Sequence, residues 1–227
     1  MCFSASASFV AAAALGSLGA VAYSKKKNTR EWPLALIPIV FAVQQAAEGF
    51  LWLSIARGHG AFTLLFTSIF LFFAFFWWPA FIPYVAMSLE ANPRTKKLLR
   101  WVWYVGAASG LVLYGLFLLR PLPAFVTGNS ICYAYYPYSA AFDAFPLIML
   151  VYIGVTVIAG VFSRHRVFQI FSLVAGAGAL TAWFFHSTTF TSVWCFFAAI
   201  VSLILLYQPD QKQTATKPRL KKIKTAV

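Results

Sequence analysis

The stretch Gln44-Gln45-Ala46-Ala47-Glu48-Gly49-Phe50-Leu51-Trp52 places an acidic side chain inside a long apolar segment. At helical spacing, Gln44, Glu48 and Trp52 lie one turn apart on a single face, with Gln45 close beside it. A carboxylate in hydrocarbon is costly, so it must face the interior of a helix bundle and find a partner there. The stretch therefore predicts a polar stripe inside a membrane helix, and with it the first candidate for a functional site.

The composition of the whole chain supports a membrane protein. Of its 227 residues, 61% are hydrophobic and only 10% are charged, whereas a soluble domain carries about 25% charged residues. We predict an all-α, polytopic membrane protein with one bundle at residues 1–207 and a basic, disordered cytoplasmic tail at 208–227. The net charge of +13 does not indicate nucleic-acid binding, because the basic residues gather in loops on one side of the predicted helices.

Apolar segments separated by polar turns predict seven transmembrane helices. Their approximate bounds are Phe3–Ser24, Pro33–Ala56, Ala61–Glu90, Leu99–Leu119, Ala140–Phe162, Val167–Phe185 and Ser192–Tyr207. Pro38 is expected to bend the second helix, and Pro79 and Pro83 predict a kink in the third. The long connection 120–139 is rich in Pro and Tyr, so we expect it to lie across the outer mouth of the bundle, as an interfacial anchor or a lid.

The distribution of Lys and Arg predicts the orientation of these helices. Sixteen of these residues fall in the inner loops and the tail, against Arg57 and Arg120 on the outside. Positive loops stay in the cytoplasm, which places the N-terminus outside and the C-terminus inside. The basic cytoplasmic face is then expected to lie near anionic lipids of the bilayer.

Three stretches resemble a family of uncharacterised bacterial membrane proteins that begin Met-Cys-Phe-Ser-Ala. The stretches are Met1–Ala5, the Gln44 to Trp52 stripe, and Ser192-Val193-Trp194-Cys195-Phe196-Phe197. The resemblance implies a seven-helix integral protein of the bacterial inner membrane. It implies no activity, so the chemistry has to be read from the residues themselves.

Two further polar residues are placed near the outer ends of helices, on the same side as the opening of the stripe. Asp143 begins the fifth helix and His186 follows the sixth. We expect them to form the mouth of an outward-opening pocket whose floor is Glu48 and whose walls are Gln44, Gln45 and Trp52. An acid-lined pocket suits a proton, a metal cation or a small cationic ligand, to be bound or transported.

Other functions stay open at this stage. Glu48, Asp143 and His186 could hold zinc and a water in a metal-dependent membrane hydrolase. The stripe could instead bind another protein in a structural or assembly subunit, or Glu48 could be neutral and hydrogen-bonded for structural reasons alone. A retinal Schiff base is excluded because no Lys lies within a predicted helix, and the chain has no phosphate-binding glycine loop.

Overall fold

In the computed structural model, the chain is described at residues 4–121, 123–133 and 145–206, and it is almost entirely helical, as predicted. The main helices are α1 (Ala5–Lys26), α2 (Trp32–Ala56), α3 (Gly60–Leu71), α4 (Trp78–Leu89), α5 (Pro93–Leu119), α6 (Phe145–Val161), α7 (Arg166–Phe185) and α8 (Phe190–Val201). A π-helical turn, Phe72–Trp77, joins α3 to α4, and short 3-10 turns, Ser187–Thr189 and Ser202–Leu206, flank α8.

Several of these helices are long and apolar enough to cross a membrane. By length and composition five qualify: α1, α2, the continuous unit Gly60–Leu89, α5 and α7. Two shorter apolar helices, α6 and α8 with its 3-10 continuation, accompany them. This pattern is compatible with an integral membrane protein, while the number of crossings and their orientation stay predictions. The basic tail and Asp143 lie outside the described residues.

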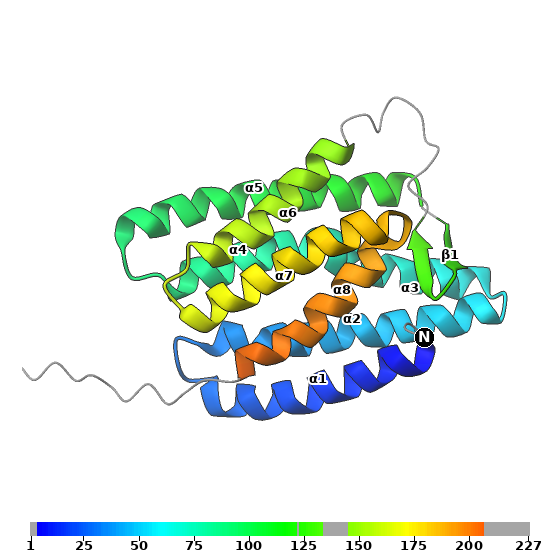
Figure 1. The fold of residues 1–227 in the computed structure, drawn as a ribbon, viewed down its shortest axis with the longest axis horizontal. Helices are drawn as coiled ribbons and strands as arrows, with labels where there is room; N and C mark the ends of the chain where they lie inside the picture. Colours follow the sequence, from blue (N-terminus) through cyan, green and yellow to red (C-terminus); the bar gives the residue numbers. More distant parts are fainter. Residues whose placement is uncertain (1–3, 122, 134–144, 207–227) are drawn as a thin grey trace, which may run out of the picture.

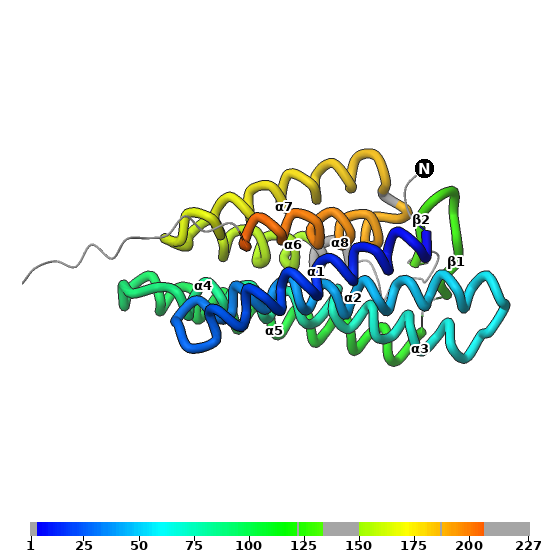
Figure 2. The backbone as a smooth tube through the Cα atoms, turned by 90° about the horizontal axis from the view of Figure 1, so that it is seen from below, coloured from blue at the N-terminus to red at the C-terminus, as the bar shows by residue number. Residues whose placement is uncertain are grey.

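The helices run side by side along the long axis of the molecule (Figure 1). The view turned by 90° shows α7 and α8 in one layer and α3, α4 and α5 in another (Figure 2). The turns α1–α2, α4–α5 and α6–α7 meet at one end, and the turns α2–α3 and α7–α8 meet at the other. We call the first the basic end, because ten Lys and Arg lie in or beside its turns, and the second the hairpin end.

The hairpin was not predicted. The first part of the connection expected to be a loop forms β1 (Ala124–Thr127) and β2 (Ser130–Tyr133), which pair antiparallel through a two-residue turn. Gly128 occupies that turn at φ 59°, a conformation that glycine adopts without strain. Every residue of β2 is buried, and Tyr133 stacks on Phe70 of α3 with ring centroids 5.1 Å apart. The hairpin therefore closes this end of the core.

The two helices in which prolines were predicted to cause a bend or a kink differ in the structure. Pro38 lies inside α2, which continues unbroken from Trp32 to Ala56. In the third predicted segment the helix widens into the π-turn, which ends at Trp77, two residues before Pro79. A π-turn is one of the recognised ways in which a helix accommodates an interruption of its hydrogen-bond ladder.

Candidate functional site

Helix α2 is the element that places the polar stripe inside the bundle. More than half of its residues are buried, and it packs against α1, α3, α4 and α8. Close approach to α1 depends on small residues, since a side chain added at Gly19 would meet Ile39 and one added at Gly49 would meet the ring of Phe9. The stripe is consequently covered by other helices rather than exposed on the surface.

Glu48 lies at the centre of this stripe and is only 1% exposed. The Ser192 hydroxyl of α8 donates a hydrogen bond of 2.6 Å to its Oε1 atom. Within the described part of the chain Glu48 makes no ion pair, since the contacts found there between basic and acidic side chains involve Glu31 and Glu90. A buried carboxyl is therefore held by a neutral partner, across the interface of two helices far apart in the sequence.

Gln44, one turn earlier, bonds to a third helix. Its Oε1 accepts a 2.7 Å hydrogen bond from the indole Nε1 of Trp78, at the start of α4. An indole nitrogen can only donate, so this bond fixes the orientation of the amide. The Nε2 atom of Gln44 then has no partner with hydrogen-bond geometry, although the amide faces the Cys195 thiol of α8.

Two further polar side chains of the stripe are enclosed without full hydrogen bonding. Gln45 is fully buried and faces the Glu48 carboxyl, yet neither of its amide atoms has a partner with hydrogen-bond geometry. The indole nitrogen of the half-buried Trp52 is also buried without a partner. Buried polar atoms are nearly always hydrogen-bonded. This concentration of donors and acceptors around one carboxyl is typical of a site that binds something polar.

The structure brings together part of the predicted site. Gln44, Gln45, Glu48 and Trp52 share α2, as the helical spacing predicted. His186 is exposed at the C-terminal end of α7, and no hydrogen bond or ion pair joins it to Glu48 in the described residues. Asp143 lies outside those residues, so its predicted place at the mouth stays a prediction.

Three residues of the site were missed in the sequence analysis: Trp78, Ser192 and Cys195. A signal for two of them was present, because Ser192 and Cys195 are three residues apart in a helix and therefore share a face. Both also belong to one of the three stretches that carry the family resemblance, and Glu48 belongs to another. In the structure these two stretches meet through the hydrogen bond from Ser192 to Glu48.

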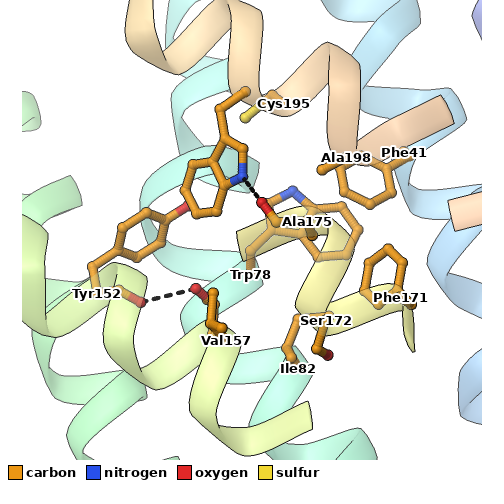
Figure 3. Close-up of a pocket in the computed structure, with 12 residues that line it drawn as sticks. Phe41, Trp78, Ile82, Tyr152, Val157, Phe171, Ser172, Ala175, Cys195 and Ala198 are labelled. Atoms are coloured by element: carbon orange, nitrogen blue, oxygen red, sulfur yellow. Dashed lines mark hydrogen bonds between the residues drawn. The ribbon is translucent and has the colours of Figure 1, made fainter. Parts of the chain in front are cut away.

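An aromatic cavity lies beside the stripe, between α2, α4, α6, α7 and α8 (Figure 3). Its volume is about 40 Å³, which is enough for a few water-sized groups. Five aromatic side chains line it: Phe41, Trp78, Tyr152, Phe171 and Trp194. Cys195 and Ser172 also line it.

A second polar cluster joins the three turns at the basic end. Arg30 donates to the carbonyl oxygens of Ser88 and Glu90, each at 2.8 Å. The buried Glu90 carboxylate lies 3.8 Å from Arg164, and Glu31 lies 3.6 Å from His165. Burial lowers the pKa of His165, and the nearby Glu31 opposes that shift. His165 is thus mainly neutral at pH 7, and the cluster serves to hold the turns together.

The described residues hold no cluster of side chains that could ligate a metal ion. Among the described residues, no three His, Cys, Asp or Glu side chains lie close enough together to hold a metal ion. Of the zinc ligands considered from the sequence, Glu48 is buried and His186 is exposed, while Asp143 is not described. The zinc site therefore stays a prediction that no contact between described residues supports.

A family model, DUF6629, described as a family of unknown function, matches residues 1–220. No curated protein and no solved structure matches the chain.

Proposed function

The chain belongs to DUF6629, a family of unknown function, and we propose that it is an integral membrane protein that binds or transports a small cation around Glu48. Seven helices would cross the bacterial inner membrane, with the N-terminus outside and the C-terminus in the cytoplasm. The binding site would be reached from the outer side, which is the hairpin end of the bundle.

One observation carries this proposal: a fully enclosed carboxyl whose bonding partner is a hydroxyl. Glu48 accepts from Ser192 and has no cationic partner among the described residues. An ionised carboxylate in this environment is strongly destabilised unless a positive charge accompanies it. A cation that enters the site supplies that charge. Because the buried carboxylate is costly without it, the electrostatic attraction between the two charges favours binding.

The surrounding amides support a binding role further. Gln45 presents a buried amide oxygen without a partner beside the carboxyl, and an amide oxygen is an acceptor that a cation can bind. A buried polar atom costs about 1–3 kcal/mol when left unsatisfied, and a bound cation would remove that cost. Neither a hydrolase nor an assembly subunit is favoured by an observation of comparable specificity.

The proposal is tested by thermal unfolding of the detergent-purified, full-length protein with a panel of chlorides: Na⁺, K⁺, Mg²⁺, Zn²⁺ and small ammonium ions. A cation that binds the folded state raises its unfolding free energy by about 2.7 kcal/mol at a concentration one hundred times its Kd. We expect at least one cation to stabilise the native chain in this way, and Glu48→Gln to abolish the effect.

Glu31→Gln is the matched control, because it removes a carboxylate at the basic end, where Glu31 is paired with Lys26. The stabilising cation should act on this variant as it does on the native protein. If no cation stabilises the native protein, or if Glu48→Gln responds as the native protein does, the proposed function is wrong.

A further inference from the structure

We propose that the aromatic cavity beside Glu48 is the ligand site, and that it takes a small alkylammonium ion rather than a metal ion. This inference rests on the proposed function, and it adds the position of the site and the chemical class of the ligand. Figure 3 shows the wall residues that carry it, contributed by α2, α4, α6, α7 and α8.

The rings that line the cavity are held in place by their own contacts. The Trp78 indole donates to Gln44, and Phe41 stacks on it with ring centroids 3.9 Å apart. The Trp194 indole donates to the Ala175 carbonyl at 3.0 Å. Tyr152 meets Trp194 edge to face at 5.5 Å. Rings fixed in this way form a rigid aromatic surface, which lowers the entropic cost of binding.

The cavity is connected to the acidic stripe through two residues of its wall. Trp78 lines the cavity and bonds to Gln44 on its other side. Cys195 also lines the cavity, and it lies one helical turn after Ser192, which donates to Glu48. A positive charge in the cavity therefore lies one layer of side chains from the Glu48 carboxyl, and Coulomb attraction is strong in surroundings of low dielectric constant.

The chemistry of the wall selects the class of cation. Metal ions such as Mg²⁺ and Ca²⁺ need six or more oxygen ligands, whereas only three of the side chains that line this cavity carry a hydroxyl: Tyr152, Thr156 and Ser172. One of these, Thr156, already donates to backbone carbonyls within its own helix. Aromatic faces instead attract ammonium groups that carry carbon substituents. The composition of the wall thus favours an organic ammonium ion over a metal ion.

The cavity volume defines the ligand more closely. The Ser172 hydroxyl does not contribute, because it packs against Gly160 of α6, where an added side chain would collide with it. A volume of about 40 Å³ holds about three water-sized groups, which is the size of dimethylammonium. The ligand head group should therefore be small and carry few carbon atoms.

The test is calorimetric titration of the full-length, detergent-purified protein with dimethylammonium chloride, in parallel with NaCl, ZnCl₂ and tetraethylammonium chloride. We expect saturable binding of dimethylammonium and none of the much larger tetraethylammonium. Phe171→Leu removes one aromatic face of the cavity and should weaken dimethylammonium binding roughly tenfold. Phe168→Leu is the control, because Phe168 stacks on Phe171 in the same helix but does not line the cavity.

If Phe171→Leu does not fold, Phe41→Leu takes its place, because Phe41 also lines the cavity, and its expected loss is again roughly tenfold. Equal losses in Phe171→Leu and Phe168→Leu, or no loss in Phe41→Leu, would overturn the inference. If Na⁺ or Zn²⁺ binds in a Glu48-dependent way and dimethylammonium does not, the proposed function stands and this inference falls. If no cation binds in a Glu48-dependent way, both fall.

Discussion

At the scale of single residues, the contact that matters most is the hydrogen bond from Ser192 to Glu48. Both side chains are almost completely enclosed, and the donor and acceptor belong to helices separated by 144 positions in the sequence. Water does not compete for the carboxyl in such a place, so the hydroxyl is its main source of stabilisation in the described structure. The contact also fixes where the carboxyl points.

Replacement of this hydroxyl should destabilise the protein measurably. We expect Ser192→Ala to lower the free energy of unfolding by about 1–2 kcal/mol, because it leaves the buried carboxyl without its donor. Ser202→Ala is the matched control, since Ser202 is equally buried but donates only to the Ala199 carbonyl of its own helix. Denaturation in mixed detergent micelles would measure both. Equal stability losses would contradict a special role for the Ser192 contact.

At the scale of elements, α4 and α5 fit together through prolines on one helix and glycines on the other. Pro79 and Pro83 have no N–H to donate to the carbonyl oxygens of Phe75 and Pro79, four residues earlier. These two carbonyls lie against Gly110 and Gly106 of α5, where an added side chain would collide with them. The glycines thus leave room for the widened helix that carries Trp78, a wall residue of the cavity.

This fit predicts opposite effects for two glycines of the same helix. Gly106→Ala would place its methyl group against the Pro79 carbonyl and 2.8 Å from a Val155 methyl, so we expect a loss of about 1–3 kcal/mol. A side chain added at Gly115 meets nothing within 4 Å, and Gly115→Ala should be neutral or stabilising by up to about 1 kcal/mol. Thermal unfolding of the two variants is the measurement. A loss in Gly115→Ala as large as that in Gly106→Ala would refute the packing argument.

At the scale of the whole molecule, charge divides the two ends of the bundle. Ten described Lys and Arg lie in or beside the turns of the basic end, whereas the hairpin end has Arg57 and Arg120. Arg30 and the ion pair between Arg164 and Glu90 join the three turns at the basic end to one another. The folded structure therefore keeps on one side the charges that the positive-inside rule places in the cytoplasm.

The corresponding prediction concerns topology in living cells. A reporter that is active only in the cytoplasm should be active when fused after Arg166 or at the C-terminus. A reporter that is active only outside the membrane should be active when inserted in the hairpin turn at 128–129. The reason is the charge asymmetry, which opposes translocation of the basic turns. A C-terminus outside the membrane would overturn both the orientation and the proposed entry from the hairpin end.

The sequence by itself determined the helical class and the placement of the long apolar helices. Its apolar runs predicted α2 and α7 to within one residue at each end, because local hydrophobicity and turn residues decide where such helices begin and end. The same periodicity placed Gln44, Gln45, Glu48 and Trp52 on adjoining positions of one helix. The cost of a carboxylate in hydrocarbon also identified Glu48 as the residue that needs a partner.

Only the tertiary structure decided which partner that is. Ser192 and Trp78 reach the stripe because α8 and α4 pack against α2, and the order of helices in space depends on packing between distant segments that leaves no local periodic signal. The hairpin was missed for a related reason, since its strands are short and β2 is buried by α8 and the turn before it. His186 was predicted to lie near the site because it falls at the same end of the helices as the opening of the stripe. In the structure its side chain is exposed and makes no hydrogen bond to Glu48 among the described residues, because the packing of the helices against one another turns it away from the stripe.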